Sequence, residues 1–351
     1  MSKHKGQFGF FDLEKQLDKI YQINDFLPKL NTIIHWELFR NDLNKVREKE
    51  RLSNAGRPSF DVVLMFKILI LKTLYNLSDE QTELQIRDRI SFRVFLGLNF
   101  CDTVPDAKTI WLFAKQLKNF QLERVLFDRF GEELSRQGFA AKGGLIIDGS
   151  FVEVPKQRHT KEENEQIKKD EVPASFSANP HVLAQKDIDA RWTKKNDVSY
   201  DGYENHALGD DGYKFVRDDG VTDASVHDSV PYLSVLPEKA AYPDQEAFGD
   251  AAYVGAETEE TLLQRGYLPM ICEKGYRNHP LTEEQKKMNN MKSTIRCRIE
   301  HLFGAMKVRC RDEVLRSIGI VRAAFWIGLR NLAYNMGRLV SLKCPKVKKV
   351  R

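Results

Sequence analysis

The sequence has few cysteines and histidines, and none of them falls into a pattern typical of a disulfide or metal site. Its 351 residues include five cysteines, an odd number, without a Cys-x-x-Cys pair. This argues against a disulfide framework and against a zinc ribbon. The eight histidines lack the His-Glu-x-x-His spacing of zinc ligands, so we interpret them as surface or core residues.

Long hydrophobic runs are also missing. The most apolar stretch, residues 62–77, is interrupted by Lys67, Lys72 and Asn76 and is too polar to span a bilayer. The opening residues, MSKHKGQFGF, lack the apolar core of a secretory signal. We therefore expect a cytoplasmic protein with no membrane partner.

Acidic residues are scarce near the C-terminus. Residues 286–351 contain 17 Lys or Arg and only 3 acids, whereas the rest of the chain has more acids than bases. Clustered basic side chains gain free energy by releasing counterions from a phosphate backbone, which favours a polyanionic partner. The alternative is a solvated helical face followed by a basic tail at residues 341–351.

The N-terminal part, residues 1–135, has the periodicity of helices. Apolar residues in the segment 62–74 recur at helical spacing and continue around the helix, which predicts a central, buried element. Ser78 and Asp106 are N-cap signals for two further helices. Such helices fit a helix-turn-helix-like DNA-binding domain and, equally, a helical bundle for dimerisation.

After residue 138 the pattern changes to short apolar runs typical of strands. The predicted strands are 143–154, 198–209, 213–226, 247–250 and 267–275. The Asp-Asp-Gly turn at 210–212 favours an antiparallel hairpin, and the polar segment 156–171 is expected to form a loop. The order predicts an α/β domain at 140–340, a mixed five-stranded sheet flanked by helices, behind an N-terminal all-helical domain.

Two of the predicted strands end on an acid. Asp148 and Asp250 each follow an apolar run, at points where a side chain faces the cleft outside a sheet. Each aspartate alone is more typical of a turn or a helix N-cap. Two carboxylates on neighbouring strands would repel each other unless a divalent cation lies between them, and Mg²⁺ prefers such oxygen ligands.

A third acid, Glu300, lies on a predicted helix. Ile299, Leu302, Phe303, Met306 and Cys310 form one apolar stripe of this helix at 100° per residue. Arg296, Glu300 and Lys307 fall together beside that stripe. A surface ion pair between Arg296 and Glu300 is the simpler interpretation. Together with the two aspartates, however, a third carboxylate can complete a two-metal site for phosphodiester chemistry.

An ordered series of motifs extends over most of the chain from Arg57 to Met336. The series reads GRPSFDVVLMFKILILKTLYNLSDEQ, FRVFLGL, VPDAKTIW, IDGSFVEVPKQRHTKEENEQIK, QKDIDARWTKK, VTDASVHDS, GDAAYVG, GYRNHPL, RCRIEHLFGAMK and GLRNLAYNM. It resembles the DDE transposases of bacterial insertion sequences, in the branch named after insertion sequence five.

The resemblance implies a ribonuclease-H-like core with Asp148, Asp250 and Glu300 as the catalytic, metal-binding triad. It also implies that Arg296 and Lys307, which match an Arg-x₃-Glu-x₆-Lys pattern, touch DNA near the scissile phosphate. Two Mg²⁺ ions, replaceable by Mn²⁺, are the expected cofactors. The expected partner is double-stranded DNA, both transposon ends and target, bound by a homodimer at the bacterial nucleoid.

Other residues are weaker candidates. Further DNA contacts are predicted for Arg298, Lys194, Lys195 and Lys115, with Arg191 and Trp192 beside them. Asp210 and Asp228 are possible rival ligands, whereas His206 and His227 are more typical of strand packing or N-capping. The tryptophans at 111, 192 and 326 are more typical of core or interface positions than of base-stacking platforms.

The sequence also departs from the family pattern. Ser293 stands where related sequences carry a tyrosine, and Glu204 stands where a lysine is expected. Two alternative functions remain open: a nuclease of the same fold that does not join ends, and a DNA-binding regulator derived from a transposase.

Overall fold

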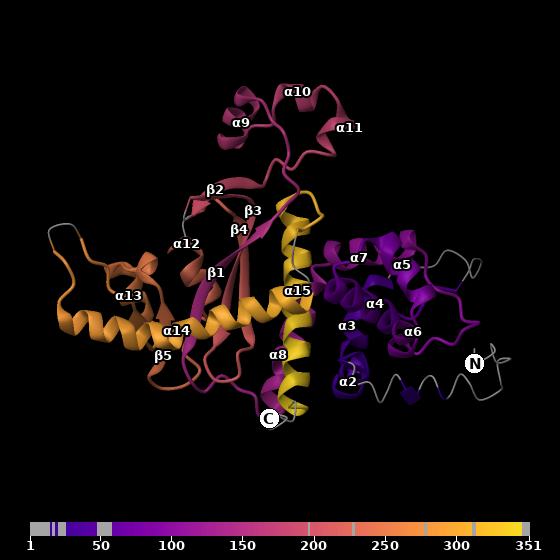
Figure 1. The fold of residues 1–351 in the computed structure, drawn as a ribbon, viewed down its shortest axis with the longest axis horizontal. Helices are drawn as coiled ribbons and strands as arrows, with labels where there is room; N and C mark the ends of the chain where they lie inside the picture. The colour runs from indigo at the N-terminus through magenta and orange to yellow at the C-terminus, as the bar shows by residue number, and fades with distance from the viewer. Residues whose placement is uncertain are drawn as a thin grey trace, which may run out of the picture. The chain divides into compact units, whose positions relative to one another are not determined.

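The computed structural model describes residues 15, 18–19, 26–47, 58–195, 197–226, 229–276, 279–310 and 314–345. Contacts divide the chain into two compact units (Figure 1). The first comprises Met1–Lys72, Leu77–Gln116 and Met336–Arg351, and the second comprises Thr73–Asn76 and Leu117–Asn335. The domain boundaries given above from the sequence stay predictions.

Helices make up the N-terminal region. They are α2 (Phe26–Ile33), η1 (Trp36–Phe39), α3 (Arg40–Asn44), η2 (Lys45–Arg47), α4 (Val62–Tyr75), α5 (Asp79–Asp88), α6 (Ile90–Leu96) and α7 (Ala107–Asn119). As predicted, α4 is central: Phe66, Ile68 and Leu71 lie on different sides of the helix and are all fully buried. An apolar helix is stable only where neighbours cover every side.

Both predicted N-caps are present. The Ser78 hydroxyl accepts a hydrogen bond from the amide of Gln81 (3.1 Å), and the Asp106 carboxylate accepts one from the amide of Thr109 (2.7 Å). These bonds satisfy amides that have no partner inside the helix. They fix the starts of α5 and α7.

A six-stranded mixed sheet forms the centre of the second unit. Its strands are β1 (Leu145–Glu153), β2 (Arg191–Lys195), β3 (Val198–Asp210), β4 (Val216–Asp223), β5 (Gln245–Gly249) and β6 (Tyr267–Ile271). The strand order is β2-β3-β1-β5-β6, and β4 also pairs with β3. Strands β1, β2 and β4 pair antiparallel with β3, whereas β5 is parallel to both β1 and β6. This is the mixed α/β, ribonuclease-H-like arrangement that the resemblance implied.

The strand β2 corrects the predicted count of five strands. The segment 191–195, RWTKK, is predicted above to contact DNA and not to form a strand, but it pairs with β3 from Arg191↔Gly202 to Lys195↔Val198. The connection is only two residues long, and Asp197 has a positive φ of 62°. β2 and β3 therefore form a tight antiparallel hairpin.

The predicted loop at 156–171 is a second correction, because it contains the helix α9 (Lys161–Lys168). Thr160 and Glu163 form a complete capping box, in which each side chain accepts a hydrogen bond from the other residue's amide. This Thr-x-x-Glu signal outweighs the low hydrophobicity of the segment. Two short helices follow it, α10 (Ala174–Ser177) and α11 (Pro180–Leu183).

The remaining helices pack around the sheet or connect its strands. They are α8 (Leu122–Arg136), α12 (Ser229–Val235), η3 (Ala251–Tyr253), α13 (Ala256–Gln264), α14 (Glu283–Cys310) and α15 (Ile320–Lys343). Contacts join α12 to β3 and β4, and α14 to β1 and β5. In Figure 1, α14 is the long helix that crosses the sheet. None of the described helices is long and apolar enough to cross a membrane.

Candidate active site

The sequence predicts both candidate acids at strand ends, but only Asp250 directly follows its strand, because β5 ends at Gly249. Asp148 lies inside β1, which continues to Glu153 because residues 149–153 stay paired with β3. Strands β1 and β5 pair as Leu145↔Ala247 and Ile146↔Phe248. Extending this register by two residues brings Asp148 opposite Asp250. Side chains at equivalent positions of adjacent strands are neighbours on the sheet surface. The parallel pairing of β1 and β5 thus carries the two acids, distant in the sequence, on adjacent strands.

Asp250 ends β5 and begins the next turn. Its carboxylate accepts a hydrogen bond from the amide of Ala252 (2.7 Å), as the N-cap of η3. The preceding Gly249 has no room for a side chain, because a Cβ there would lie 3.0 Å from the rings of both Tyr232 and Tyr253. Glycine at this position lets both rings pack against the end of β5, directly before Asp250.

The third acid is carried by α14. The predicted stripe, which includes Ile299, Leu302 and Met306, is buried, and Ile299 and Leu302 approach the sheet at Gly209. Packing of the stripe leaves the adjacent face of the helix toward solvent, and the Glu300 side chain is 62% exposed. The amphipathic pattern therefore fixes which face of α14 carries Glu300.

Arg296 connects the helix to β1. Its Nη1 donates a hydrogen bond to Oδ2 of Asp148 (3.2 Å), and its Nη2 lies 3.7 Å from Oε1 of Glu300. The Arg296 side chain is 23% exposed and that of Asp148 is 18% exposed, so solvent screens this pair less than an ordinary surface pair. A single guanidinium thus contacts two of the three candidate acids.

Further polar contacts hold α14 at other points along its length. Lys292 donates to the carbonyl of Ile271 at the end of β6 (2.8 Å), and Arg298 donates to the carbonyl of Asp211 in the β3–β4 turn (3.2 Å). Along α14, Lys292 thus contacts the end of β6, Arg296 contacts β1 and Arg298 contacts the β3–β4 turn, which is the order of these elements across the sheet. The position of Glu300 is set by several contacts rather than by one.

The donor set is suitable for a divalent metal ion, although the acids are not gathered around a common point. Within the described ranges, no group of three or more His, Cys, Asp or Glu side chains is close enough to hold a metal ion. Three carboxylates supply the hard oxygen ligands that Mg²⁺ and Mn²⁺ prefer. The chemistry of the three carboxylates fits such an ion, whereas a common binding point would require their side chains to come closer together.

The predicted DNA-binding residues have different surroundings. Lys307 and Lys115 are exposed, and the Nζ of Lys115 lies 5.0 Å from the ring centre of Trp111. Lys194 is exposed and pairs with Asp197 (2.9 Å). Arg298 is engaged with Asp211, as described above. The side chain of Lys195 lies outside the described residues.

The rival candidates have structural roles where they can be described. Asp210 is 3% exposed, and its carboxylate accepts bonds from the amides of Lys214 and Phe215 and from Arg217. His206 is fully buried, with Nε2 2.9 Å from the Thr222 hydroxyl. Both residues stabilise the β3–β4 hairpin. His227 and Asp228 lie outside the described residues.

A buried polar network was not anticipated from the sequence. The side-chain amides of Asn205 and Asn331 exchange two hydrogen bonds (3.1 and 3.2 Å), and Asn331 also donates to Asp219 (3.0 Å). Asn335, one turn further along α15, bonds both the amide and the carbonyl of Val216. Two asparagines at i and i+4 within the apolar stretch GLRNLAYNM are the signal that could have revealed this face.

Comparisons with known proteins identify both parts of the chain. Residues 15–116 match the family described as Transposase domain (DUF772), and residues 140–336 match the family described as Transposase DDE domain. The structure is similar to that of the piggyBac transposase synaptic complex with hairpin DNA, with a TM-score of 0.47 and 14% sequence identity. That alignment covers 91% of this chain and 75% of the other.

The DDE match covers more than half of the chain and includes all three candidate acids. The assignment to the insertion-sequence-five branch stays a prediction. The chain belongs to the family of DDE transposases, enzymes that cut and join DNA in a reaction that depends on divalent metal ions.

Proposed function

We propose that the protein is the transposase of an insertion sequence and that Asp148, Asp250 and Glu300 form its catalytic, metal-binding triad. The observation that carries the proposal is the parallel register of β1 and β5, continued from Ile146↔Phe248, with α14 crossing both strands. Asp148 inside β1, Asp250 directly after β5 and Glu300 on α14 are the three carboxylates that we propose to act together.

The donor set supports two Mg²⁺ ions, or Mn²⁺ in their place, as the cofactors. When bound, such ions lower the pKa of an attacking water and stabilise the charge on the leaving oxygen. The chain's own contribution is to hold the carboxylates on three rigid elements. Asp250 keeps one oxygen engaged with the amide of Ala252, which restrains its rotation.

Arg296 is proposed to stabilise the charge of the site and of the DNA. In the structure its guanidinium contacts both Asp148 and Glu300. When those carboxylates bind metal, the same guanidinium becomes free for a phosphate oxygen, with which it can form paired hydrogen bonds. Lys307, two turns beyond Glu300 on α14, is proposed to contact the same DNA backbone.

The proposed substrates are the terminal inverted repeats of the element and a target duplex. The excess of basic residues in 286–351 supports phosphate contacts along α14 and α15. We also propose that a homodimer brings two ends together, and that the enzyme acts on nucleoid DNA in the bacterial cytoplasm.

The test is cleavage and joining of labelled duplex that carries the element's own end, with Mg²⁺ or with a chelator. We expect metal-dependent cut and joined products from the wild type and none from Asp250→Asn. Asparagine can still accept the Ala252 amide bond as an N-cap, so this substitution removes the charge while it preserves the turn. The matched control is Asp244→Asn, at an exposed position just before β5.

Each outcome distinguishes between functions. Products that Asp250→Asn still forms would remove Asp250 from the triad. Cut products without joined ones would indicate a nuclease of the same fold. Salt-sensitive DNA binding without any metal-dependent product would indicate a regulator.

A further inference from the structure

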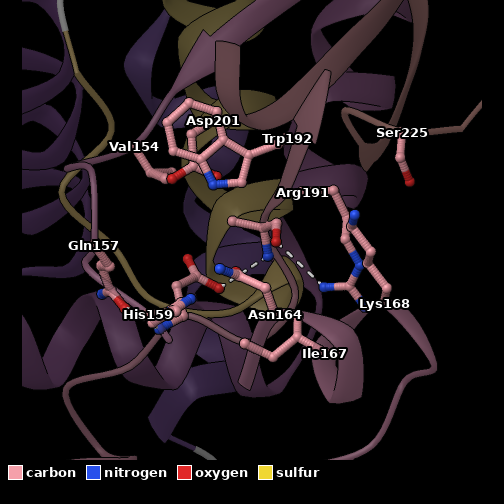
Figure 2. Close-up of a pocket in the computed structure, with 12 residues that line it drawn as sticks. Val154, Gln157, His159, Asn164, Ile167, Lys168, Arg191, Trp192, Asp201 and Ser225 are labelled. Carbon is pink, nitrogen blue, oxygen red and sulfur yellow. Dashed lines mark hydrogen bonds between the residues drawn. The ribbon is translucent and has the colours of Figure 1, made fainter. Parts of the chain in front are cut away.

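A pocket of about 260 Å³ lies between the α9 region and the strands β2 and β3, apart from the three acids (Figure 2). Residues that matter for its chemistry are Val154, Asn164, Ile167, Trp192, Asp201 and Ser225. Figure 2 shows Trp192 and Asp201 on one side, facing Asn164 and Ile167 of α9 on the other. The volume is slightly below that of sites for drug-sized ligands, about 300 Å³ and more, so it suits a single ring system.

The floor of the pocket contains a buried carboxylate. Asp201 is 7% exposed, and within the described ranges its side chain has no hydrogen-bond donor, although the charge of Lys156 acts on its carboxylate. A buried polar group without a partner costs free energy unless a ligand or water provides one. A ligand that donates hydrogen bonds to the Asp201 carboxylate would therefore be stabilised in this pocket.

The neighbouring groups do not meet this need. Asp187 is already satisfied, because its carboxylate accepts bonds from the Tyr203 hydroxyl (2.8 and 2.9 Å) and from the amide of Ala190 (3.2 Å). Arg191 is directed elsewhere and forms an ion pair with Asp170 (2.6 Å). Lys156 acts on Asp201 through its charge without a hydrogen bond to it, so the Asp201 carboxylate can still accept hydrogen bonds from an incoming group.

The rim favours a flat ligand attached to a phosphate chain. Trp192 is 47% exposed, and the Nζ of Lys156 lies 5.8 Å from its ring centre. Lys168, also at the pocket, is exposed. An indole face stacks well on an aromatic ring, and two lysines at the rim attract phosphate but repel a cationic side chain.

We propose that this pocket receives one unpaired base of the bound DNA, with the donor edge of the base on Asp201 and its face against Trp192. The inference rests on the proposed action on DNA and adds a base-binding site to it. In a duplex the pairing edge of a base is hidden, so only an unstacked base can present its N–H donors to a carboxylate. Guanine, with adjacent ring and exocyclic N–H donors, matches the two oxygens of a carboxylate.

The test measures DNA affinity by fluorescence anisotropy with the full chain and a chelator, so that no DNA is cut. Three short duplexes are compared: one with a single bulged guanine, one with an abasic bulge at the same position, and one fully paired. We expect the bulged guanine to bind about tenfold more tightly than the abasic bulge. Asp201→Asn and Trp192→Ala should each abolish most of this preference.

The control is Trp111→Ala, which removes a tryptophan of similar exposure (49%) from α7. It should leave the preference for the guanine bulge unchanged, whatever its effect on overall affinity. Because Trp192 is half exposed, its loss tests the pocket without disturbing a core.

A wild type without the preference, or a preference that survives both pocket substitutions, overturns the inference. A protein that cuts its ends in the cleavage assay yet shows no preference overturns this inference and leaves the proposed function standing. If Asp201→Asn instead changes only the oligomeric state in sedimentation, the pocket belongs to a contact between copies and the inference is wrong.

Discussion

Arg296 and Asp148 are 148 residues apart in the sequence, yet their side chains form a hydrogen bond of 3.2 Å between α14 and β1. The contact joins the helix that carries Glu300 to the strand that carries the first candidate acid. It makes Arg296 both a structural link and, under the proposed mechanism, a phosphate ligand.

Replacement of Arg296 by glutamine should separate these two roles. We expect single-turnover cleavage to fall about 10²-fold or more, because a positioned donor is lost where charge develops. The slope of the logarithm of DNA affinity against the logarithm of salt concentration should become about one unit less steep, because one phosphate contact is lost. Lys239→Gln, at an exposed position outside the basic region 286–351, should change neither the rate nor the slope by a comparable amount.

Glu300→Gln tests a carboxylate that stability does not require. The side chain is 62% exposed, so the free energy of unfolding should change by no more than about 0.5 kcal/mol. Cleavage, by contrast, should disappear, because an amide is a poor ligand for a hard cation. Urea denaturation and the cleavage assay on the same preparation measure both quantities. A loss of activity accompanied by unfolding would not support a catalytic role.

Asp219 should make stability depend on pH. Burial raises the pKa of its carboxyl from 3.8 to about 6, although Asn331 and Arg124 act in the opposite direction. Between these two values the unfolded chain ionises while the folded chain stays protonated. Stability therefore falls as pH rises through this window, by about 1.4 kcal/mol per pH unit and at most about 3 kcal/mol in total.

Asp219→Asn should remove this dependence. The variant keeps an oxygen for the Asn331 amide, so it should be more stable than the wild type at pH 7 and lose that advantage toward pH 4. Glu123, whose carboxyl pKa burial also raises, lies beside Asp219 and adds a smaller change of the same sign. Urea denaturation at several pH values measures the difference; a difference that does not vary with pH would contradict the assignment.

Gly202 should be intolerant of any side chain. Its φ is 150°, and a Cβ would lie 2.2 Å from the carbonyl oxygen of Val152 on the paired strand. Gly202→Ala should lower the free energy of unfolding by at least about 2 kcal/mol, because backbone atoms cannot move aside. Gly131, inside α8 with nothing within 4 Å of its Cβ position, is the matched control. There alanine should stabilise the protein by about 0.5–1 kcal/mol.

The parts of the fold that depend on local signals could be predicted from the sequence. Ser78 and Asp106 cap their helices because an N-cap needs only a side-chain oxygen and an amide nearby in the chain. The apolar stripe of α14 is buried because its period matches the helix. The Asp-Asp-Gly turn produced the expected antiparallel pair β3–β4.

Other features depend on contacts between residues far apart in the sequence, and short sequence patterns do not predict such contacts. The Arg296–Asp148 bond requires that α14 already be docked on β1. The strand β2 was missed because five residues with two adjacent lysines show hardly any alternation. Asp201 gave no sequence signal at all: its burial follows from the way the α9 region covers the sheet.

The order of the strands also determines when the enzyme can become active during synthesis. Strand β1 is made first but lies inside the finished sheet, between β3 and β5. Until both neighbours leave the ribosome, its edges stay open to mispairing with other chains. The helix with Glu300 emerges later still, so under the proposed assignment a nascent chain lacks the third acid of the triad for most of its translation. Cleavage of DNA therefore has to wait until α14 has been made and has docked.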